Sequence, residues 1–374
     1  VMDHLKKRQQ EKQALQASLM HPARAKQKMK IDGQEMDAFD KGFLADPSKY
    51  EDLDADIADA AANEESAELF CDYMPKKCRV GGPHPDPVVE GASLAAVDPP
   101  AMSYELHEGL APILQKRQLS SLQTEAVLYA CMRHSMTLGD GKSTAGFFLG
   151  DGAGVGKGRT IAALVIENVK RGRKRNIWVS VTNDLLLDAK RDIKDLGFEK
   201  SIKVWGLNKQ AYSKLDSGQG VHEGVLYCTY HSLIGKKSGA SLAAGKKSGS
   251  GRNKTFTTRL DQIVDWCGGT SYDGLLVFDE GHKAKNLVPQ GGAGSTKIGE
   301  AVQALQRLLP RAKVVYASAT GASEPKHMGY MSRLGVWGVG TSFPPQNGDT
   351  TGFLNFQKSV EKGRMAGIEL VAMD

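Results

Sequence analysis

The sequence lacks the features of membrane and secreted proteins. No run of about 18 or more apolar residues occurs, and charges are spread throughout the first thirty residues. Cysteine is also sparse: the five residues form no C-x-x-C pair and are widely spaced, which argues against a zinc site or a disulfide framework. We therefore expect an intracellular protein, in a reducing compartment, that does not enter a membrane.

The charge of the chain is concentrated in one segment. The formal net charge is +6, and residues Gly235–Lys254 carry six basic residues and no acid, so the rest of the chain is neutral. This Gly-, Ser- and Lys-rich stretch predicts a flexible surface loop, either a solvated insertion or a counter-charge for phosphates. A second basic run at Lys170–Arg175 is typical of a nuclear-import signal, a phosphate contact or a solvated loop. Overall charge is thus weak evidence for nucleic-acid binding.

The pattern of residues divides the chain into three parts. Residues 1–67 are polar and charge-segregated, which predicts a helical or disordered arm. Residues 68–105 are rich in Pro and Gly and predict extended chain with short strands. From residue 106 to 374, apolar runs alternate with amphipathic stretches, which predicts an α/β lobe with a mostly parallel sheet flanked by helices. Strands are expected near 145–149, 176–181, 202–205, 225–229, 274–278 and 313–317, and helices at 159–170, 183–196, 257–267 and 297–309.

A glycine-rich loop follows the first of these strands. The run from Gly150 to Arg159 leads directly into a helical pattern, and strand, glycine loop, lysine and helix in this order predict a phosphate-binding P-loop. Glycines let backbone N–H groups turn onto phosphates, the helix amino end adds positive potential, and Lys157 supplies a mobile charge. A ligand-free glycine turn is the weaker alternative. The expected nucleotide-binding residues are Asp151, Gly152, Gly154, Gly156, Lys157, Gly158, Arg159 and Thr160.

Two positions of this loop depart from the common pattern G-x-x-x-x-G-K-[ST]. Asp151 stands at the first position and Gly158 at the last. The missing hydroxyl at Gly158 matters because that oxygen normally ligates Mg²⁺. Thr160, two residues later, is the candidate replacement as a metal ligand, provided that the first helical turn is displaced.

An acidic box follows a second apolar strand. Asp279 and Glu280 come directly after Leu275–Phe278, so both carboxylates should lie at the carboxyl edge of the sheet beside the P-loop. Asp279 would hold Mg²⁺, Glu280 would orient and deprotonate the attacking water, and His282 would relay the state of the γ-phosphate. Solvated charges at a strand end are the alternative for an isolated Asp-Glu pair. Together with Lys157, these residues predict ATP hydrolysis with Mg²⁺.

Further motifs accompany this pair in the order typical of superfamily 2 helicases. Ser318 and Thr320 of a Ser-Ala-Thr tripeptide would link the acidic box to movement between lobes. Gln123, at the start of a helix, would read the adenine edge through its amide, or simply lie on the surface.

Two further strand ends carry residues suited to contact a nucleic-acid backbone. Thr182 and Asn183 follow one strand, and Thr229 and Tyr230 follow another. The alternative is that these residues cap helices, since Thr and Asn are common cap residues.

Taken together, these stretches closely resemble the Strawberry notch family of helicase-like nuclear proteins. The resemblance rests on residues 84–90, 120–127, 146–162, 273–287 and 316–322. It implies a RecA-like P-loop NTPase lobe of a two-lobed, Snf2-like motor that regulates transcription and chromatin in the nucleus. The family similarly carries Gly-Lys-Gly-Arg in its P-loop, so Gly158 does not mark a dead enzyme. The resemblance does not imply a demonstrated unwinding activity.

The residues after Thr320 are too few for a second motor lobe, so we expect this chain to be the first lobe of a longer protein. Its expected partners are ATP, the second lobe, DNA or chromatin, and transcription regulators. By itself it should bind nucleotide better than it hydrolyses it, because helicase ATPases complete their site with arginines from the second lobe. Two alternatives remain: a nucleotide-gated scaffold for transcription factors with little turnover, and a helicase subunit of a restriction or mobile-element system.

Overall fold

The computed structural model describes residues 70–91, 95–152, 154–237, 254–281, 296–319, 325–346 and 351–362, and the backbone at 29–31 and 34–36. The chain divides into two compact units, Val1–Leu69 and Phe70–Asp374. In the first unit, β1 (Met29–Ile31) pairs antiparallel with β2 (Gln34–Met36). The helices predicted in the arm lie outside the described residues, as does most of the basic segment Gly235–Lys254.

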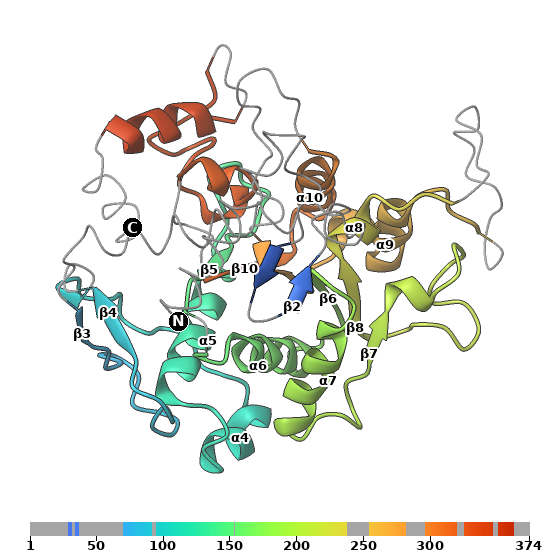
Figure 1. Cartoon of the computed structure of the whole chain (residues 1–374). Helices are drawn as coiled ribbons and strands as arrows, with labels where there is room; N and C mark the ends of the chain where they lie inside the picture. Colours follow the sequence, from blue (N-terminus) through green and yellow to red (C-terminus); the bar gives the residue numbers. More distant parts are fainter. Residues whose placement is uncertain are drawn as a thin grey trace. The chain divides into compact units, whose positions relative to one another are not determined.

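The second unit is built on a six-stranded sheet in which every neighbouring pair is parallel (Figure 1). Its spatial order is β5 (Phe147–Leu149), β10 (Lys313–Ala317), β9 (Leu275–Asp279), β6 (Arg175–Ser180), β8 (Gly224–Thr229) and β7 (Val204–Gly206). Each strand lies within two residues of its predicted position. The predicted fold class is therefore confirmed: the unit is a RecA-like α/β lobe.

The central strands are apolar along their whole length because both faces of the sheet are covered. Successive side chains of a strand point to opposite faces. In β6, Ile177 and Val179 belong to one hydrophobic cluster and Trp178 to the other. A strand buried on one face only would have alternated apolar and polar residues.

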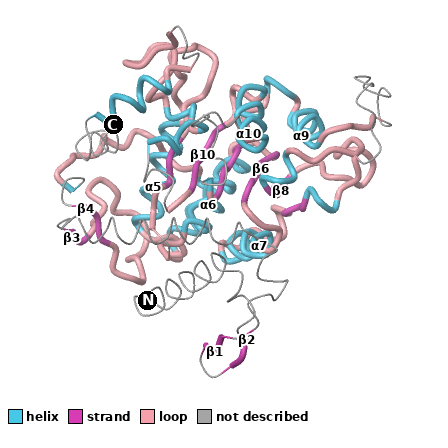
Figure 2. Tube along the Cα trace, turned by 45° about the horizontal axis from the view of Figure 1, so that its top comes forward, coloured by secondary structure: helices cyan, strands magenta, loops and turns pink. Residues whose placement is uncertain are grey.

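Helices cover the two faces of the sheet (Figure 2). One face packs against α5 (Ser121–Arg133), α6 (Lys157–Lys170) and α7 (Leu185–Asp195), and the other against α8 (Tyr230–Leu233), α9 (Arg259–Cys267) and α10 (Lys297–Leu308). The four helices predicted by bounds are confirmed to within two residues at each end. Shorter helical segments are η1 (Glu108–Leu110), α4 (Ala111–Gln115), η2 (Leu207–Lys209), η4 (Gly269–Ser271), η6 (Pro325–Tyr330) and η7 (Ser332–Leu334). No described helix is long and apolar enough to cross a membrane.

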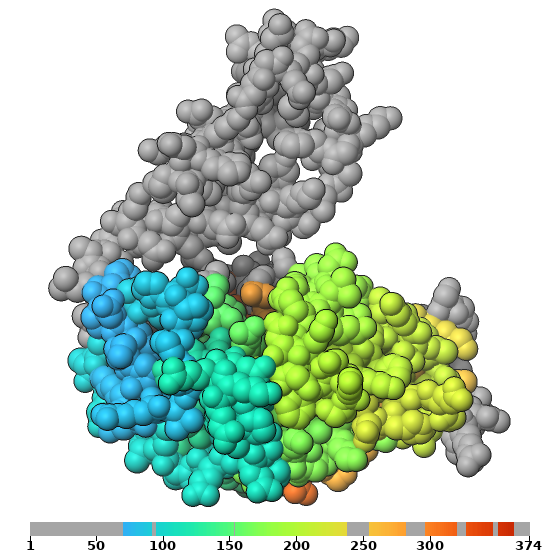
Figure 3. Space-filling model, turned by 90° about the horizontal axis from the view of Figure 1, so that it is seen from below, coloured from blue at the N-terminus to red at the C-terminus, as the bar shows by residue number. Residues whose placement is uncertain are grey.

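Two further segments pack around this core. The antiparallel pair β3 (Phe70–Asp72) and β4 (Val89–Gly91) lies before α4, and Tyr73 beside it donates a hydrogen bond to the buried Glu125 of α5. This early segment and the chain that follows it through α4 form the blue and teal part of the face seen in Figure 3, beside a yellow-green region that includes α7. Late in the sequence of this unit, a helix over 353–362 packs Phe353 and Phe356 against the buried Trp337.

The basic run at 170–175 is largely engaged within the fold. The Arg171 guanidinium lies 2.8 Å from Glu167, and that of Arg175 lies 2.9 Å from Asp216. Arg173 donates to the side chain of Asn168 at 2.6 Å. Of the alternatives weighed from the sequence, these bonds favour the loop that joins α6 to β6, although its arginines are bonded within the fold and not only solvated.

Candidate active site

The strand ends of the sheet bring the predicted motifs into one row. Leu149, which precedes the P-loop, is in register with Ala317, and Ala317 is in register with Asp279. On the other side of β9, the pairing of β6 places Ser180 next in the row, and Ser180 is in register with Thr229. Because all six strands are parallel, their carboxyl ends meet at this edge. Five segments far apart in the sequence therefore converge.

The P-loop forms an open cradle at this edge. Gly154 and Gly156 have φ angles of +91° and +84°, in the left-handed region that glycine adopts without strain. A Cβ placed on Gly152 or Gly154 would meet nothing within 4 Å. The helix α6 begins at Lys157, and no side chain caps its amino end. An uncapped helix start beside a glycine loop that no side chain crowds suits the phosphates of a nucleotide.

Lys157 lies across its own loop. Its Nζ donates to the carbonyl oxygens of Asp151 at 2.8 Å and Gly152 at 3.1 Å. Burial raises the pKa of the Asp151 carboxyl, and the nearby charges of Lys157 and His84 oppose that shift. The Oδ2 atom of Asp151 is buried without a hydrogen-bond partner among the described residues. Phosphate oxygens would replace the carbonyls as acceptors for the amine.

Two side chains converge on one carbonyl of the loop. Gln123 donates from Nε2 to Val155 O at 3.1 Å, and Nε2 of His84 lies 3.2 Å from the same oxygen. The Oε1 atom of Gln123 accepts from Ser120 N at 3.1 Å, in a capping box at the start of α5. Gln123 therefore contacts the P-loop itself. Both the nitrogen and the oxygen of its side-chain amide already form hydrogen bonds. His84 was not assigned a role from the sequence, although it begins one of the stretches that carry the family resemblance, because its contact with Val155 joins distant parts of the chain.

Asp279 is held by neighbours on two strands. Its Oδ2 atom accepts hydrogen bonds from Trp178 Nε1 at 3.2 Å and Ser180 Oγ at 3.1 Å. Its backbone oxygen accepts from the Tyr230 hydroxyl at 3.0 Å. Burial raises the pKa of the Asp279 carboxyl, and the two side-chain donors oppose that shift. The carboxylate is therefore oriented by groups that the sequence analysis did not assign to it.

The charges around Asp279 belong to the other predicted catalytic residues. Glu280 raises the pKa of Asp279 and Lys157 lowers it, so each of these two side chains lies within electrostatic reach of Asp279. Glu280 has a φ of +51°, a left-handed conformation that is strained for a residue with a side chain. Strained backbone of this kind is concentrated at functional sites.

The position of the missing P-loop hydroxyl is occupied by another helix. A Cβ on Gly158 would lie 3.2 Å from Cγ of Asp192 on α7 and closer still to Oδ2 of the same carboxylate. Glycine is thus the residue that fits here. Thr160, the predicted substitute, is 1% exposed, and its hydroxyl has no partner among the described residues.

The described residues contain no group of three or more His, Cys, Asp and Glu side chains that could hold a metal ion by themselves. Mg²⁺ commonly binds through one or two carboxylates together with substrate phosphates. The oriented carboxylate of Asp279, beside the open glycine cradle, fits an ion that enters with a nucleotide.

The remaining predicted residues lie in varied places. Arg159 pairs with Asp195 at 3.1 Å on the surface of α7. Ser318 is fully buried, and its N–H donates to Leu149 O at 3.1 Å, which ties the Ser-Ala-Thr segment to the start of the P-loop. His282 and Thr320 lie outside the described residues.

The two candidate nucleic-acid segments differ in exposure. Thr182 and Asn183 are exposed just beyond β6. Thr229 is 8% exposed and caps α8 by accepting from Ser232 N. Tyr230 is 1% exposed beneath the acidic box, where its hydroxyl is bonded, so its side chain does not face a nucleic acid in this structure.

Comparison with known proteins gives a family match over residues 83–374, to the model described as P-loop containing NTP hydrolase pore-1. Among curated proteins, the chain is similar to Protein FORGETTER 1 of Arabidopsis thaliana, at 50% identity over 83% of this chain and 22% of that protein. It is 48% identical to Protein strawberry notch homolog 1 of Gallus gallus, over 82% of this chain and 23% of that protein. The chain spans about a fifth of the length of these relatives.

A solved structure, the Sulfolobus solfataricus SWI2/SNF2 ATPase core in complex with dsDNA, overlaps 67% of this chain and 42% of its own. The TM-score is 0.41 and the sequence identity is 15%, a likeness too distant to bear on function.

Proposed function

Because the chain belongs to the family described as P-loop containing NTP hydrolase pore-1, we propose that it binds ATP with Mg²⁺ as the first lobe of a helicase-like ATPase. The observation that carries this proposal is the single row formed by Leu149, Ala317 and Asp279. This register places the P-loop, the Ser-Ala-Thr segment and the acidic box side by side at the ligand-binding edge of a parallel sheet. Chance strand-end charges would not be expected to adjoin an open glycine cradle.

The residues of the P-loop and of the acidic box have separate tasks in this proposal. The backbone N–H groups around Gly152 and Gly154 hold the phosphates, and Lys157 exchanges its two loop carbonyls for phosphate oxygens. Asp279 holds the metal, which when bound neutralises charge on the phosphates. Glu280 orients the attacking water and accepts its proton. Thr160 as a further metal ligand would require its buried hydroxyl to become accessible.

The adenine end of the nucleotide is assigned to the side of the loop where Gln123 lies. The amide of Gln123 is bonded to Val155 O and Ser120 N, so reading a base requires it to release one of these bonds. We propose that the Gln123 amide bonds to Val155 O before nucleotide binds and turns to the adenine base when nucleotide binds. His282 and Thr320 are proposed to pass that change to the nucleic-acid side, together with Ser318.

The wider role rests on the family and on exposed residues. Thr182 and Asn183 stand at the active edge with exposed side chains suited to a phosphate backbone. We propose that a longer protein with a second lobe couples ATP hydrolysis to DNA or chromatin and works with transcription regulators in the nucleus. These relatives, of which the match to this chain covers 22–23%, are long enough to hold such a lobe.

The test is ATP hydrolysis by the full-length protein, with and without double-stranded DNA, compared with the Glu280→Gln variant. We expect stimulated hydrolysis that the variant abolishes while ATP binding is retained. Equal hydrolysis by wild type and variant would sink the assignment of Glu280.

A second function, a nucleotide-gated scaffold, is favoured by Gly158, which carries no hydroxyl for the metal. In that case ATP binds and turnover stays low with DNA present. Rapid stimulated turnover would exclude the scaffold.

A further inference from the structure

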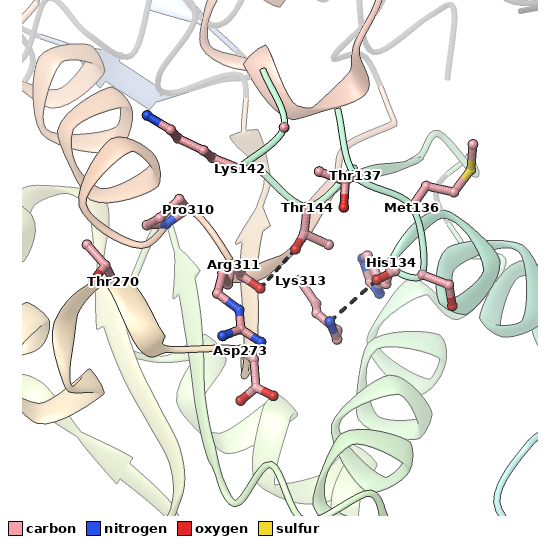
Figure 4. Close-up of a pocket in the computed structure, with 12 residues that line it drawn as sticks. His134, Met136, Thr137, Lys142, Thr144, Thr270, Asp273, Pro310, Arg311 and Lys313 are labelled. Carbon is pink, nitrogen blue, oxygen red and sulfur yellow. Dashed lines mark hydrogen bonds between the residues drawn. The ribbon is translucent and has the colours of Figure 1, made fainter. Parts of the chain in front are cut away.

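A cavity of about 590 Å³ lies at the edge of the sheet opposite the P-loop. It is bounded by the end of α5, the chain at 136–144 and the connections that lead into β9 and β10 (Figure 4). Lys313 is the first residue of β10 and Asp273 precedes β9, so the cavity faces the amino ends of these strands, whereas the candidate active site lies at their carboxyl ends. Its volume falls within the range of roughly 300–1,000 Å³ typical of small-molecule sites.

The lining of this cavity carries an excess of positive charge. Lys142, Arg311 and Lys313 line it, and Asp273 is the only acid among the lining residues. In the part of the chain that the structure describes, none of these three cations forms a salt bridge. Figure 4 shows Arg311, Lys313 and Asp273 grouped where β9 and β10 begin. The protein thus brings cations together without supplying matching acids.

Lys313 is the most constrained of these cations. Its Nζ donates to the backbone oxygen of His134 at 3.4 Å, a long and uncharged contact. Burial lowers the pKa of Lys313, and the nearby guanidinium groups of Arg173 and Arg311 lower it further, while Asp273 opposes them. A bound anion would offset this repulsion.

His134 adds no charge of its own. Its Nε2 lies 3.0 Å from Val314 O, so the ring donates there, and burial lowers its pKa to about 3. The positive charge of the lining therefore belongs to Lys142, Arg311 and Lys313.

We propose that this cavity binds a phosphate-bearing small molecule, with Arg311 and Lys313 contacting the phosphoryl oxygens and Lys142 at the rim. The planar fork of an arginine matches two oxygens of a phosphate, and a neighbouring lysine adds a point charge. Thr137 and Thr270 place hydroxyl groups in the same lining, which suits a ligand that also carries hydroxyls. The site is separate from the nucleotide site and does not depend on the function proposed for it.

The test uses isothermal titration of the full chain with two probes, fructose 1,6-bisphosphate and inorganic phosphate. Arg311→Gln is expected to weaken binding by about tenfold or more, the usual effect of losing one charge-assisted hydrogen bond. Asp273→Asn is expected to strengthen binding, because it removes the one acid of the lining. The matched control is Arg307→Gln, which removes the same charge from an exposed position on α10 outside the cavity.

The outcomes separate the sources and the alternatives. Tighter binding of the sugar phosphate supports the site for an organic phosphate, and equal binding supports it for the free ion. Equal weakening by Arg307→Gln and Arg311→Gln would show non-specific attraction and overturn the proposal. If neither probe binds, the proposal is also overturned. It is overturned as well if Lys157→Ala, and not Arg311→Gln, abolishes binding of the probes, because the phosphate would then lie in the P-loop. If a short oligonucleotide binds in a way that depends on Arg311 and neither phosphate probe does, the proposal is overturned and the ligand is a nucleic acid.

Discussion

Restoring the common P-loop threonine, by Gly158→Thr, should destabilise this chain. The new Cβ would lie 3.2 Å from Cγ of Asp192 and nearer to its Oδ2, inside the separation that real Cβ contacts tolerate. The Asp192 side chain is only 13% exposed, so little open space surrounds the carboxylate that would have to move. Overpacking of this kind costs about 1–3 kcal/mol in the free energy of unfolding.

A double-mutant cycle isolates this contact. Asp192→Ala removes the obstructing carboxylate, and by itself it should cost little, since the nearest cation, Arg191, is 3.7 Å away and largely exposed. In that background Gly158→Thr should be close to neutral, which gives a coupling energy of about 1–3 kcal/mol. Thermal unfolding followed by circular dichroism would detect it, because 1 kcal/mol shifts Tm by roughly 1–2 °C in a chain of this size. The same cost of Gly158→Thr in both backgrounds would refute the packing explanation for the glycine.

Three further predictions concern other residues of the fold. Gly152→Ala should leave the free energy of unfolding within about 0.5 kcal/mol of wild type, yet weaken Mg·ATP binding in calorimetry, because its methyl group enters the open cradle; unchanged affinity would contradict this. Ser180→Ala should cost about 1–3 kcal/mol in urea unfolding by removing a donor to the half-buried Asp279, and Ser180→Thr should restore most of it; equal losses in both would count against the bond. For His134, the unfolded chain takes up a proton below about pH 6.5 and the folded chain only near pH 3. The free energy of unfolding should therefore decrease as the pH is lowered across that window, by up to about 1.4 kcal/mol per pH unit. His134→Gln should flatten the slope, and an identical slope would disprove the contribution.

The strands and the two phosphate-site motifs could be predicted because their signals are local. Fully apolar runs such as Leu275–Phe278 can be buried on both faces only in a parallel sheet, and that topology then places their carboxyl ends together. The order of strand, glycine loop, Lys157 and helix is likewise contained within one short stretch.

The support of the site could not be predicted in this way, because its contacts join residues distant in sequence. Trp178 reaches Asp279 across 101 positions, and His84 reaches Val155 across 71. Which side chain faces which depends on strand register and on where a helix begins, and a shift of one residue reverses the face. The sequence likewise placed Tyr230 just after a strand but did not show which way its side chain points. In the structure it is buried below the acidic box.

The place of Gly158 depends on the packing of one helix on another. Its neighbour Asp192 lies 34 positions later, in the third turn of α7, and no local pattern connects the two. An unusual residue within a motif can therefore mark a packing constraint as well as a change in chemistry.

The most direct test of the central claim is the equilibrium affinity of the full chain for Mg·ATP, measured for wild type, Lys157→Ala and the exposed-surface control Lys190→Ala. The site described above predicts that Lys157→Ala weakens binding by at least about tenfold, or ~1.4 kcal/mol, while Lys190→Ala matches wild type. Equal affinities for all three proteins would contradict the assignment of Gly150–Lys157 as the nucleotide site.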